Sequence, residues 1–201
     1  MKLTADEALR AIYIDYEGNV DAPPTLLGWS VDEHVTAGIL EPAFATCANR
    51  YRVRSVDFYD HSILARRLLH LAERENRVIV SWSEHDLKVM ESVLDSDEQQ
   101  RLRIVYRNAT KTARPWHQKA HGKLPNGATL AYFCELLGFA VPDRYGTGIV
   151  GDALRLLRQQ LSEGRHYADL TPKARGAWVA VVKHNRLDLL GTAHVLRKIL
   201  S

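Results

Sequence analysis

Two carboxylates stand at the end of the first apolar stretch of the chain. Residues 11–14 (Ala-Ile-Tyr-Ile) are apolar without alternation, which is typical of a short strand buried on both faces. Asp15 and Glu17 follow, and residues two apart in a strand point to the same face. Two carboxylates this close repel each other unless a proton or a cation lies between them, and Mg²⁺ takes such oxygen ligands. A solvated strand end is the simpler interpretation of Asp-x-Glu, so the pair predicts a metal site only with support from the rest of the chain.

Two further carboxylates follow elements that belong to the interior. Residues 78–82 (Val-Ile-Val-Ser-Trp) form a second apolar stretch of the buried-strand type, and the helix predicted to follow it carries Asp86. The last helix, predicted over residues 171–200, carries His184 and Asp188, which are four residues apart and therefore share a face. The simpler interpretation of that pair is a polar border to the apolar stripe of the helix.

The composition is that of one globular domain. The chain has 201 residues, of which 46% are hydrophobic and 25% are charged. This is enough to bury a sizeable core and is unlike a disordered or fibrous chain. We therefore predict a single domain over residues 1–201. The net charge of +3 permits a polyanionic partner without requiring one.

Cysteine usage and the first residues bear on the location of the protein. Cys47 and Cys134 are the only cysteines, which argues against a disulfide scaffold or a thiolate zinc site and fits a reducing cytosol. Residues 1–7 contain no apolar signal core, and no stretch is long enough to span a bilayer. We predict a cytoplasmic protein without membrane contact.

The pattern between the motifs predicts a mixed sheet flanked by helices. Strands are expected at residues 25–31, 35–40 and 51–56, as an antiparallel part of the sheet. A helix from Asp60 to Arg74 ahead of strand 78–82 indicates a βαβ unit with a parallel pair. The stripe of that helix that faces the sheet is predicted to comprise Ile63, Leu64, Leu68, Leu71 and Ala72. Further elements are expected as a strand at 103–106 and helices at 128–137 and 149–161.

One long segment contains basic and aromatic residues but no acidic ones. Between residues 99 and 134 there is no Asp or Glu, although the rest of the chain is nearly balanced in charge. An ordinary solvated loop is one interpretation. The other is a surface that contacts a phosphate backbone and offers an aromatic ring for base stacking. The residues predicted to make these contacts are Arg107, Lys111, Arg114, Trp116, Lys119 and Lys123.

Three motifs together resemble the DEDD group of 3′–5′ exonucleases on the ribonuclease-H-like fold. The first is residues 13–17 (Tyr-Ile-Asp-Tyr-Glu), and the second is the strand and turn at residues 78–87, which contains Asp86. The third is residues 184–192 (His-Asn-Arg-Leu-Asp-Leu-Leu-Gly-Thr), similar to the Tyr-Asn-x-x-Asp stretch of that group. The resemblance covers nearly the whole chain, and the order of the motifs makes it moderately specific.

The resemblance implies an α/β fold with a ribonuclease-H-like mixed sheet, and an enzyme that hydrolyses phosphodiester bonds at nucleic-acid 3′ ends. Such enzymes use two Mg²⁺ or Mn²⁺ ions, which stabilise the attacking and leaving oxygens. Asp15 would bridge the two ions, Glu17 and Asp188 would complete one of them, and Asp86 would act on the second through water. His184 would orient or deprotonate the attacking water. The expected substrate is DNA or RNA with a single-stranded 3′ end.

The sequence departs from the pattern of the group in two places. His184 lies at the spacing of the tyrosine class but is the residue of the histidine class, whose own position is taken by Lys183. The second motif lacks the asparagine that is common a few residues before its aspartate, and Glu84 is a nearby carboxylate that could assist Asp86. No metal ligand is lost through either departure, so activity is still expected.

Two alternatives to the exonuclease stay open at this point. One is a catalytically silent nucleic-acid-binding module on the same fold, which the basic segment and the unusual third motif favour. The other is a ribonuclease-H-like endonuclease or resolvase that cuts internally, because a fold alone does not define the reaction.

Overall fold

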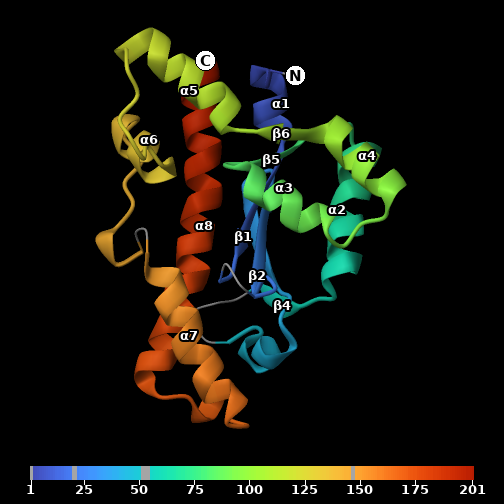
Figure 1. The fold of residues 1–201 in the computed structure, drawn as a ribbon, viewed down its shortest axis with the longest axis vertical. Coiled ribbons are helices and arrows are strands. Elements are labelled where there is room, and N and C mark those ends of the chain that lie inside the picture. The colour runs from blue at the N-terminus through green and yellow to red at the C-terminus, as the bar shows by residue number, and fades with distance from the viewer. Residues whose placement is uncertain (1, 20–21, 51–54, 146–147) are drawn as a thin grey trace.

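The protein is an α/β structure built on a mixed sheet (Figure 1). The computed structural model describes residues 2–19, 22–50, 55–145 and 148–201. Within them six strands form one sheet in the order β4-β3-β2-β1-β5-β6. The strands are β1 (Ile12–Glu17), β2 (Leu26–Val31), β3 (His34–Ile39), β4 (Val56–Phe58), β5 (Ile79–Ser81) and β6 (Tyr106–Asn108). This confirms the predicted α/β class and is consistent with a ribonuclease-H-like fold.

The strand β1 lies near the middle of the sheet and changes its pairing from one side to the other. It is antiparallel to β2, which is in turn antiparallel to β3. On its other side β1 is parallel to β5, and β5 is parallel to β6. The strands that flank the helix at residues 61–74, β4 and β5, are not paired with each other, because β3, β2 and β1 lie between them, so the predicted parallel pair across this helix is wrong and the parallel neighbours of β5 are β1 and β6. Because β1 is covered on both faces, its first residues are apolar without alternation.

Helices cover both faces of the sheet. They are α1 (Ala5–Arg10), α2 (His61–Arg74), α3 (Glu84–Glu91), α4 (Ser96–Val105), α5 (Thr110–His121), α6 (Leu130–Leu136), α7 (Ile149–Ser162) and α8 (Pro172–Leu200), with short 3₁₀ helices η1 (Pro42–Cys47), η2 (Asp143–Tyr145) and η3 (Tyr167–Asp169). The helices α2, α3 and α4 bury apolar residues against one face. The long α8 packs against the other face, together with α1 and α7 (Figure 1). No helix among the residues described is both long and apolar enough to cross a membrane.

Short polar side chains fix where these helices begin. The Asp60 carboxylate accepts a hydrogen bond from the Ile63 N–H at the start of α2, as predicted for an N-cap. Thr171 caps α8 by accepting from the Ala174 N–H, and Pro172 occupies the first helical position. The element that carries His184 and Asp188 is thus defined at its N-terminus by local sequence.

Several predicted elements differ from the structure. Residues 103–105 belong to α4 rather than to a strand, because the capping box of Asp95 and Glu98 starts a helix that continues to Val105, and β6 begins only at Tyr106. The predicted strand at 51–56 lies mostly outside the described residues. The described β4 pairs parallel to β3, which corrects the expected antiparallel arrangement.

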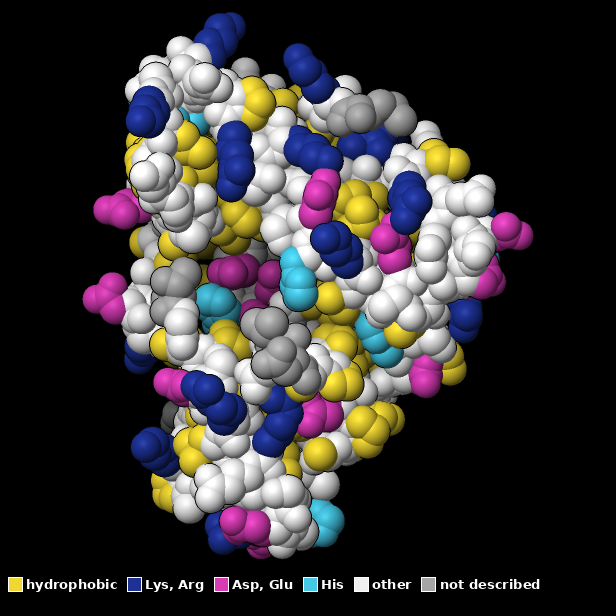
Figure 2. All heavy atoms as spheres, in the orientation of Figure 1, with side chains coloured by type: hydrophobic (Ala, Val, Ile, Leu, Met, Phe, Trp, Pro, Cys, Tyr) yellow, Lys and Arg dark blue, Asp and Glu magenta, His cyan; other side chains and the backbone are white. Residues whose placement is uncertain are grey.

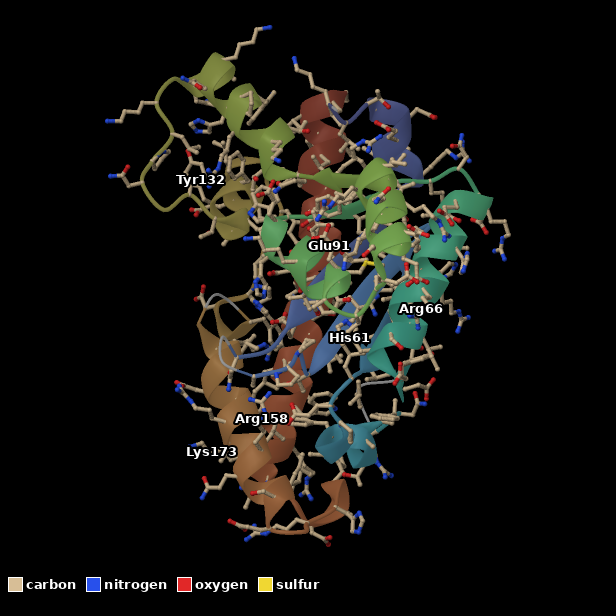
Figure 3. The ribbon with its side chains drawn as sticks, turned by 45° about the vertical axis from the view of Figure 1, so that its right-hand side comes forward. His61, Arg66, Glu91, Tyr132, Arg158 and Lys173 are labelled. Carbon is tan, nitrogen blue, oxygen red and sulfur yellow. The ribbon has the colours of Figure 1, made fainter. Side chains whose placement is uncertain are left out.

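Two further differences concern α2 and the basic segment. Ile63 is 63% exposed and Leu71 is only partly buried, whereas the predicted Leu64, Leu68 and Ala72 are buried together with Leu69. The stripe is therefore rotated by part of a turn from its predicted position. The acid-free segment contains a helix, α5, where the simpler interpretation expected a loop. Figure 3 labels Tyr132 on α6, whose hydroxyl contacts the buried His117 of α5 at 2.7 Å and joins the two helices.

Candidate active site

Four carboxylates from three separate elements converge beside β1. Asp15 and Glu17 lie on β1 itself, and Asp86 lies in the first turn of α3, directly after the parallel neighbour β5. Asp188 comes from α8, which packs across β1 and β2. The pairing of β1 with β5 therefore brings Asp86 close to Asp15, although the two residues are 71 positions apart in the sequence. Glu17 and Asp86 are only 7% and 5% exposed.

The shifts of the carboxylate pKa values record how close these groups are. Burial raises the pKa of Asp15 well above its ordinary value, and the negative charges of Glu17, Asp188 and Asp86 raise it further. Burial also raises the pKa of Glu17, to about 7, against the lowering effect of the nearby imidazole of His184. The pKa values of Asp86 and Asp188 are raised for the same main reason, burial. The cluster thus holds more negative charge than its protein surroundings neutralise.

Hydrogen bonds orient two of the carboxylates. The Asn185 side-chain amide donates both to the Asp15 carbonyl oxygen, at 2.9 Å, and to Asp15 Oδ2, at 2.8 Å. Asp86 Oδ1 accepts from the Tyr16 N–H at 3.1 Å, and Oδ2 accepts from the Ser83 hydroxyl at 3.3 Å. In contrast, Glu17 Oε1 is buried without a hydrogen-bond partner in the described part of the chain. Such an orphaned acceptor is costly unless a ligand satisfies it.

His184 lies between Glu17 and Asp188 with one nitrogen already committed. Its Nδ1–H donates to the Tyr145 carbonyl oxygen at 2.6 Å, because a carbonyl can only accept. The other nitrogen, Nε2, lies 3.5 Å from Asp188 Oδ2 and 3.9 Å from Glu17 Oε1. Burial alone lowers the pKa of His184, but the charges of Asp188 and Glu17 outweigh it and the net shift is upward. The Nε2 position is therefore suited to exchanging a proton with a bound molecule.

A glycine on β2 allows α8 to approach closely enough for this geometry. A Cβ atom at Gly28 would lie 1.8 Å from Asn185 Oδ1 and 2.9 Å from a methyl carbon of Leu189. Any larger residue at this position would therefore push away the side chain that holds Asp15. In the sheet Gly28 is directly opposite Asp15. A substitution of this glycine would therefore disturb the candidate site itself.

A cleft of about 860 Å³ opens beside the carboxylates. His184 and Asp188 line it from α8, and α5, α6 and the turn after β5 supply its other walls. Figure 2 shows acidic side chains and a histidine in a hollow at the middle of this face, with Lys and Arg side chains above and below it. The walls include apolar and polar groups from Trp82, Asn108, Thr110, Pro115, Leu130 and Cys134.

The structure places only some of the predicted basic residues beside the cleft. Lys111 and Arg114 line the cleft, and Lys111 forms an ion pair with the exposed Glu84. Glu84 also lines the cleft, and its assistance to Asp86 stays a prediction. Arg107 does not join this surface, because it is 9% exposed and forms an ion pair with Glu7 beside a different pocket. The physical reason is that Arg107 lies on the edge strand β6 and its guanidinium pairs with Glu7 of α1.

The remaining members of the basic segment lie further along α5 and just after it. Trp116 is half-buried and packs edge-on against His121, so its ring belongs partly to the apolar contact between α5 and α6. Lys119 and Lys123 are exposed and lie outside the lining of the cleft. Sequence reasoning gave no role to Asn185 or to the carbonyl of Tyr145. The signal for the first was available, since Asn185 adjoins His184 in the third motif, whereas a backbone carbonyl leaves no sequence signal.

Comparisons with models of protein families, with curated proteins and with solved structures found no match. Among the residues described, no group of three or more His, Cys, Asp or Glu side chains is already arranged to hold a metal ion. The carboxylates therefore converge without a preformed coordination sphere, and the metal site stays a prediction.

Proposed function

We propose that the protein is a metal-dependent 3′–5′ exonuclease that hydrolyses phosphodiester bonds at nucleic-acid ends. The observation that carries the proposal is the cluster of Asp15, Glu17, Asp86 and Asp188. Burial raises the pKa values of all four carboxyl groups. The negative charges of other carboxylates in the cluster raise the pKa values of Asp15, Glu17 and Asp188 further. Grouping four acids at a site where two are buried and two are partly buried is unfavourable without a cation, which favours a role that uses one.

The donor set fits two divalent cations. All four side chains offer carboxylate oxygens, which Mg²⁺ and Mn²⁺ prefer, and Glu17 Oε1 is a buried acceptor with no partner among the described residues. Asp15, Glu17, Asp86 and Asp188 would hold the ions after adjustment of their side chains. When bound, such ions stabilise the charge that develops on the attacking and leaving oxygens of a phosphodiester.

His184 would handle the proton of the attacking water. Its Nδ1–H is held by the Tyr145 carbonyl, which leaves Nε2 as the atom that faces Glu17 and Asp188. In the neutral ring Nε2 carries the free lone pair and can accept a proton from water. The neighbouring carboxylates then stabilise the imidazolium that forms, which accounts for the direction of the pKa shift of this residue.

The cleft would hold the end of the substrate strand. Its volume of about 860 Å³ suits a nucleotide, and its walls combine apolar side chains with polar groups. Lys111 and Arg114 at its border are placed to contact phosphate oxygens. Because the cleft runs beside Asp188 and His184, a strand end seated there would present its phosphate to the carboxylates.

The test is cleavage of 5′-labelled single-stranded DNA, duplex DNA and single-stranded RNA with Mg²⁺ or Mn²⁺, beside an EDTA control. The wild type is expected to shorten at least one of them from its 3′ end, and Asp15→Asn to lose at least about a hundredfold in rate, as removal of metal-ion stabilisation predicts. Asp97→Asn removes an exposed acid from α4 and should cleave like the wild type.

Other outcomes would replace the proposal. Internal cuts that require the metal and Asp15 would favour the endonuclease. Equal cleavage by the wild type and Asp15→Asn would exclude this site as the source of activity. Absence of cleavage on every substrate, with binding that weakens steeply as salt is added, would make the silent binding module the better account.

A further inference from the structure

A second groove lies on the opposite side of Tyr145 from the cleft. Its volume is about 640 Å³, and it runs between η2, η3 and the first turns of α8. The residues that line it are Arg144, Tyr145, Tyr167, Pro172, Arg175, Gly176, Val179 and Ala180. None of these described lining residues is acidic. The groove therefore combines two guanidinium groups and two phenol rings on an otherwise small and apolar floor.

The acidic members of η2 and η3, Asp143 and Asp169, do not line the groove. Asp169 belongs to η3, and its carboxylate accepts a hydrogen bond from the His166 N–H, which closes that short helix on itself. Arg175 donates to the Ala168 carbonyl oxygen at 3.0 Å with one nitrogen. A guanidinium group has five N–H donors, so Arg175 retains donors for an anion in the groove.

Both tyrosine rings already carry cations on or near their faces. The Arg144 guanidinium carbon lies 4.8 Å from the centre of the Tyr145 ring, and the Lys183 ammonium lies 5.3 Å from the same ring. Arg50 lies 5.8 Å from the centre of the Tyr167 ring. Because Arg144 is exposed, it can move from the ring to a phosphate while a nucleobase takes its place. Alternating rings and cations of this kind are the usual means of holding single strands without sequence preference.

The groove and the cleft of the candidate active site share one lining residue. Tyr145 lines both the groove and the cleft, and its carbonyl oxygen holds His184. Lys183, the neighbour of His184 on α8, also donates to the Tyr145 hydroxyl at 3.2 Å. A chain that leaves the cleft beside Asp188 would thus pass Tyr145 directly into the groove.

We propose that this groove binds single-stranded nucleic acid, with phosphates on Arg144 and Arg175 and bases on Tyr145 and Tyr167. It would hold the part of the strand that precedes the terminal nucleotide in the cleft, and in that respect it rests on the proposed function. Bases that stack singly on the two tyrosine rings must be unpaired, and a duplex does not offer unpaired bases. The expected ligand is therefore a single strand.

Binding is measured by fluorescence anisotropy of a labelled twelve-nucleotide strand, about the length that a single-strand groove and its surroundings cover, in EDTA so that nothing is cleaved. The double variant Arg144→Ala/Arg175→Ala is expected to bind at least about tenfold more weakly. Its plot of log affinity against log salt should be shallower by about 1.4, the value for two phosphate contacts on a single strand. Arg67→Ala/Arg74→Ala removes two exposed arginines from α2 and should leave both quantities unchanged.

Further arms identify what the groove recognises. Tyr167→Leu preserves apolar bulk but removes one of the two rings, so it should reduce the preference for an oligothymidine over an abasic strand of equal length. An unchanged preference would show that the groove is a general polyanion site and would overturn the proposal. Parallel titrations with DNA, RNA and duplex DNA distinguish the source of the strand, and tighter binding of the duplex would also overturn it. If the double variant fails to fold, Arg144→Glu changes only an exposed side chain and should give the same loss.

The groove and the proposed activity fail in different ways. A groove variant that binds and cleaves long strands like the wild type would exclude the groove but leave the exonuclease intact. Weakened binding in a protein that cleaves nothing would retain the groove and exclude the exonuclease. Where cleavage exists, a dinucleotide is too short to reach the groove, so Arg144→Ala/Arg175→Ala should slow only the longer substrate.

Discussion

Two buried acidic groups lie close together near the end of β1, and the protein neutralises only one of them. Glu41 accepts hydrogen bonds from Arg158 with both of its oxygens and a further one from the Thr25 hydroxyl. The N–H of the same Thr25 donates to the carbonyl oxygen of Glu17, whose Oε1 has no hydrogen-bond partner among the described residues and lies 3.9 Å from the imidazole of His184. Figure 3 labels Arg158 on α7, the residue whose positive charge pairs with Glu41.

The contrast separates a carboxylate that the protein itself neutralises from a cluster that we propose to be functional. Arg158, which is itself about four-fifths buried, neutralises Glu41. This ion pair joins α7 to the sheet and needs no bound ligand. Asp15, Glu17, Asp86 and Asp188 share His184 and the donors of Asn185, Ser83 and Tyr16, which do not balance four charges. The cluster therefore stores unfavourable electrostatic energy that a bound cation would remove.

The largest expected effect is a loss of stability as pH rises without metal. Glu17 titrates at 4.5 when unperturbed and at about 7 in the folded protein, so between these values only the native state keeps its proton. The unfolding free energy should fall by about 3 kcal/mol over that interval and stay low above it. The raised pKa of His184 acts in the same direction at higher pH. Urea unfolding in EDTA at about pH 5 and about pH 8 measures the change.

The variant Glu17→Gln isolates this contribution from those of other acids. A neutral amide cannot titrate, so most of the fall should disappear in this variant. Glu41→Gln should retain the fall, because it changes the carboxylate that is already paired. A fall of equal size in Glu17→Gln and the wild type would show that the strain lies elsewhere.

The next effect is stabilisation by a divalent cation. A ligand that binds only the folded protein raises the unfolding free energy by about 2.7 kcal/mol at a hundred times its dissociation constant. Mn²⁺ should therefore raise the melting temperature of the wild type at neutral pH, and Asp188→Asn should lose most of this increase. The measurement is a thermal scan in Mn²⁺ against one in EDTA. An equal increase in Asp188→Asn would place the binding of Mn²⁺ outside the cluster.

Substitutions in the two groups should change stability with opposite signs. Arg158→Met leaves Glu41 without its cation and should cost about 2 kcal/mol, less than for a fully buried pair because both side chains are about one-fifth exposed. Asp15→Asn removes a repelled charge while its oxygen can still accept from Asn185, and in EDTA it should raise stability by about 1 kcal/mol. Denaturant midpoints of the two variants test the contrast. If Asp15→Asn destabilised the protein as much as Arg158→Met does, the expected contrast between the two groups would be contradicted.

The sequence was sufficient for the parts of the site that depend on local patterns. The sequence places Asp15 and Glu17 on a buried strand, and the spacing of His184 and Asp188 puts them on one face of a helix. Both features are found in the structure. The convergence with Asp86 depends on the parallel pairing of β1 with β5, which a single sequence does not specify.

Other features could not be predicted because local signals conflict. Ile104 and Val105 suggested a strand, yet the helix that starts at the Asp95 cap is long enough to include them, and Ile104 is 64% exposed. The cluster of basic residues without acidic ones suggested a solvated loop where α5 forms. The groove beside Tyr167 arises where η2, η3 and α8 meet, and no periodic pattern marks such short 3₁₀ helices.

The smallest expected effect comes from Asn185, which holds Asp15 without belonging to the acidic cluster. Asn185→Ala removes both donors to Asp15, and loss of such a supporting contact costs about tenfold or more in metal affinity or activity. If Asn185 only orients Asp15 toward a cation, a higher Mn²⁺ concentration should restore most of the cleavage rate, and the melting temperature in EDTA should change little. Gln100→Ala, at an exposed position on α4, serves as the control. A loss that no Mn²⁺ concentration repairs would instead assign Asn185 to the packing of α8 against Gly28, where the backbone approach is closest.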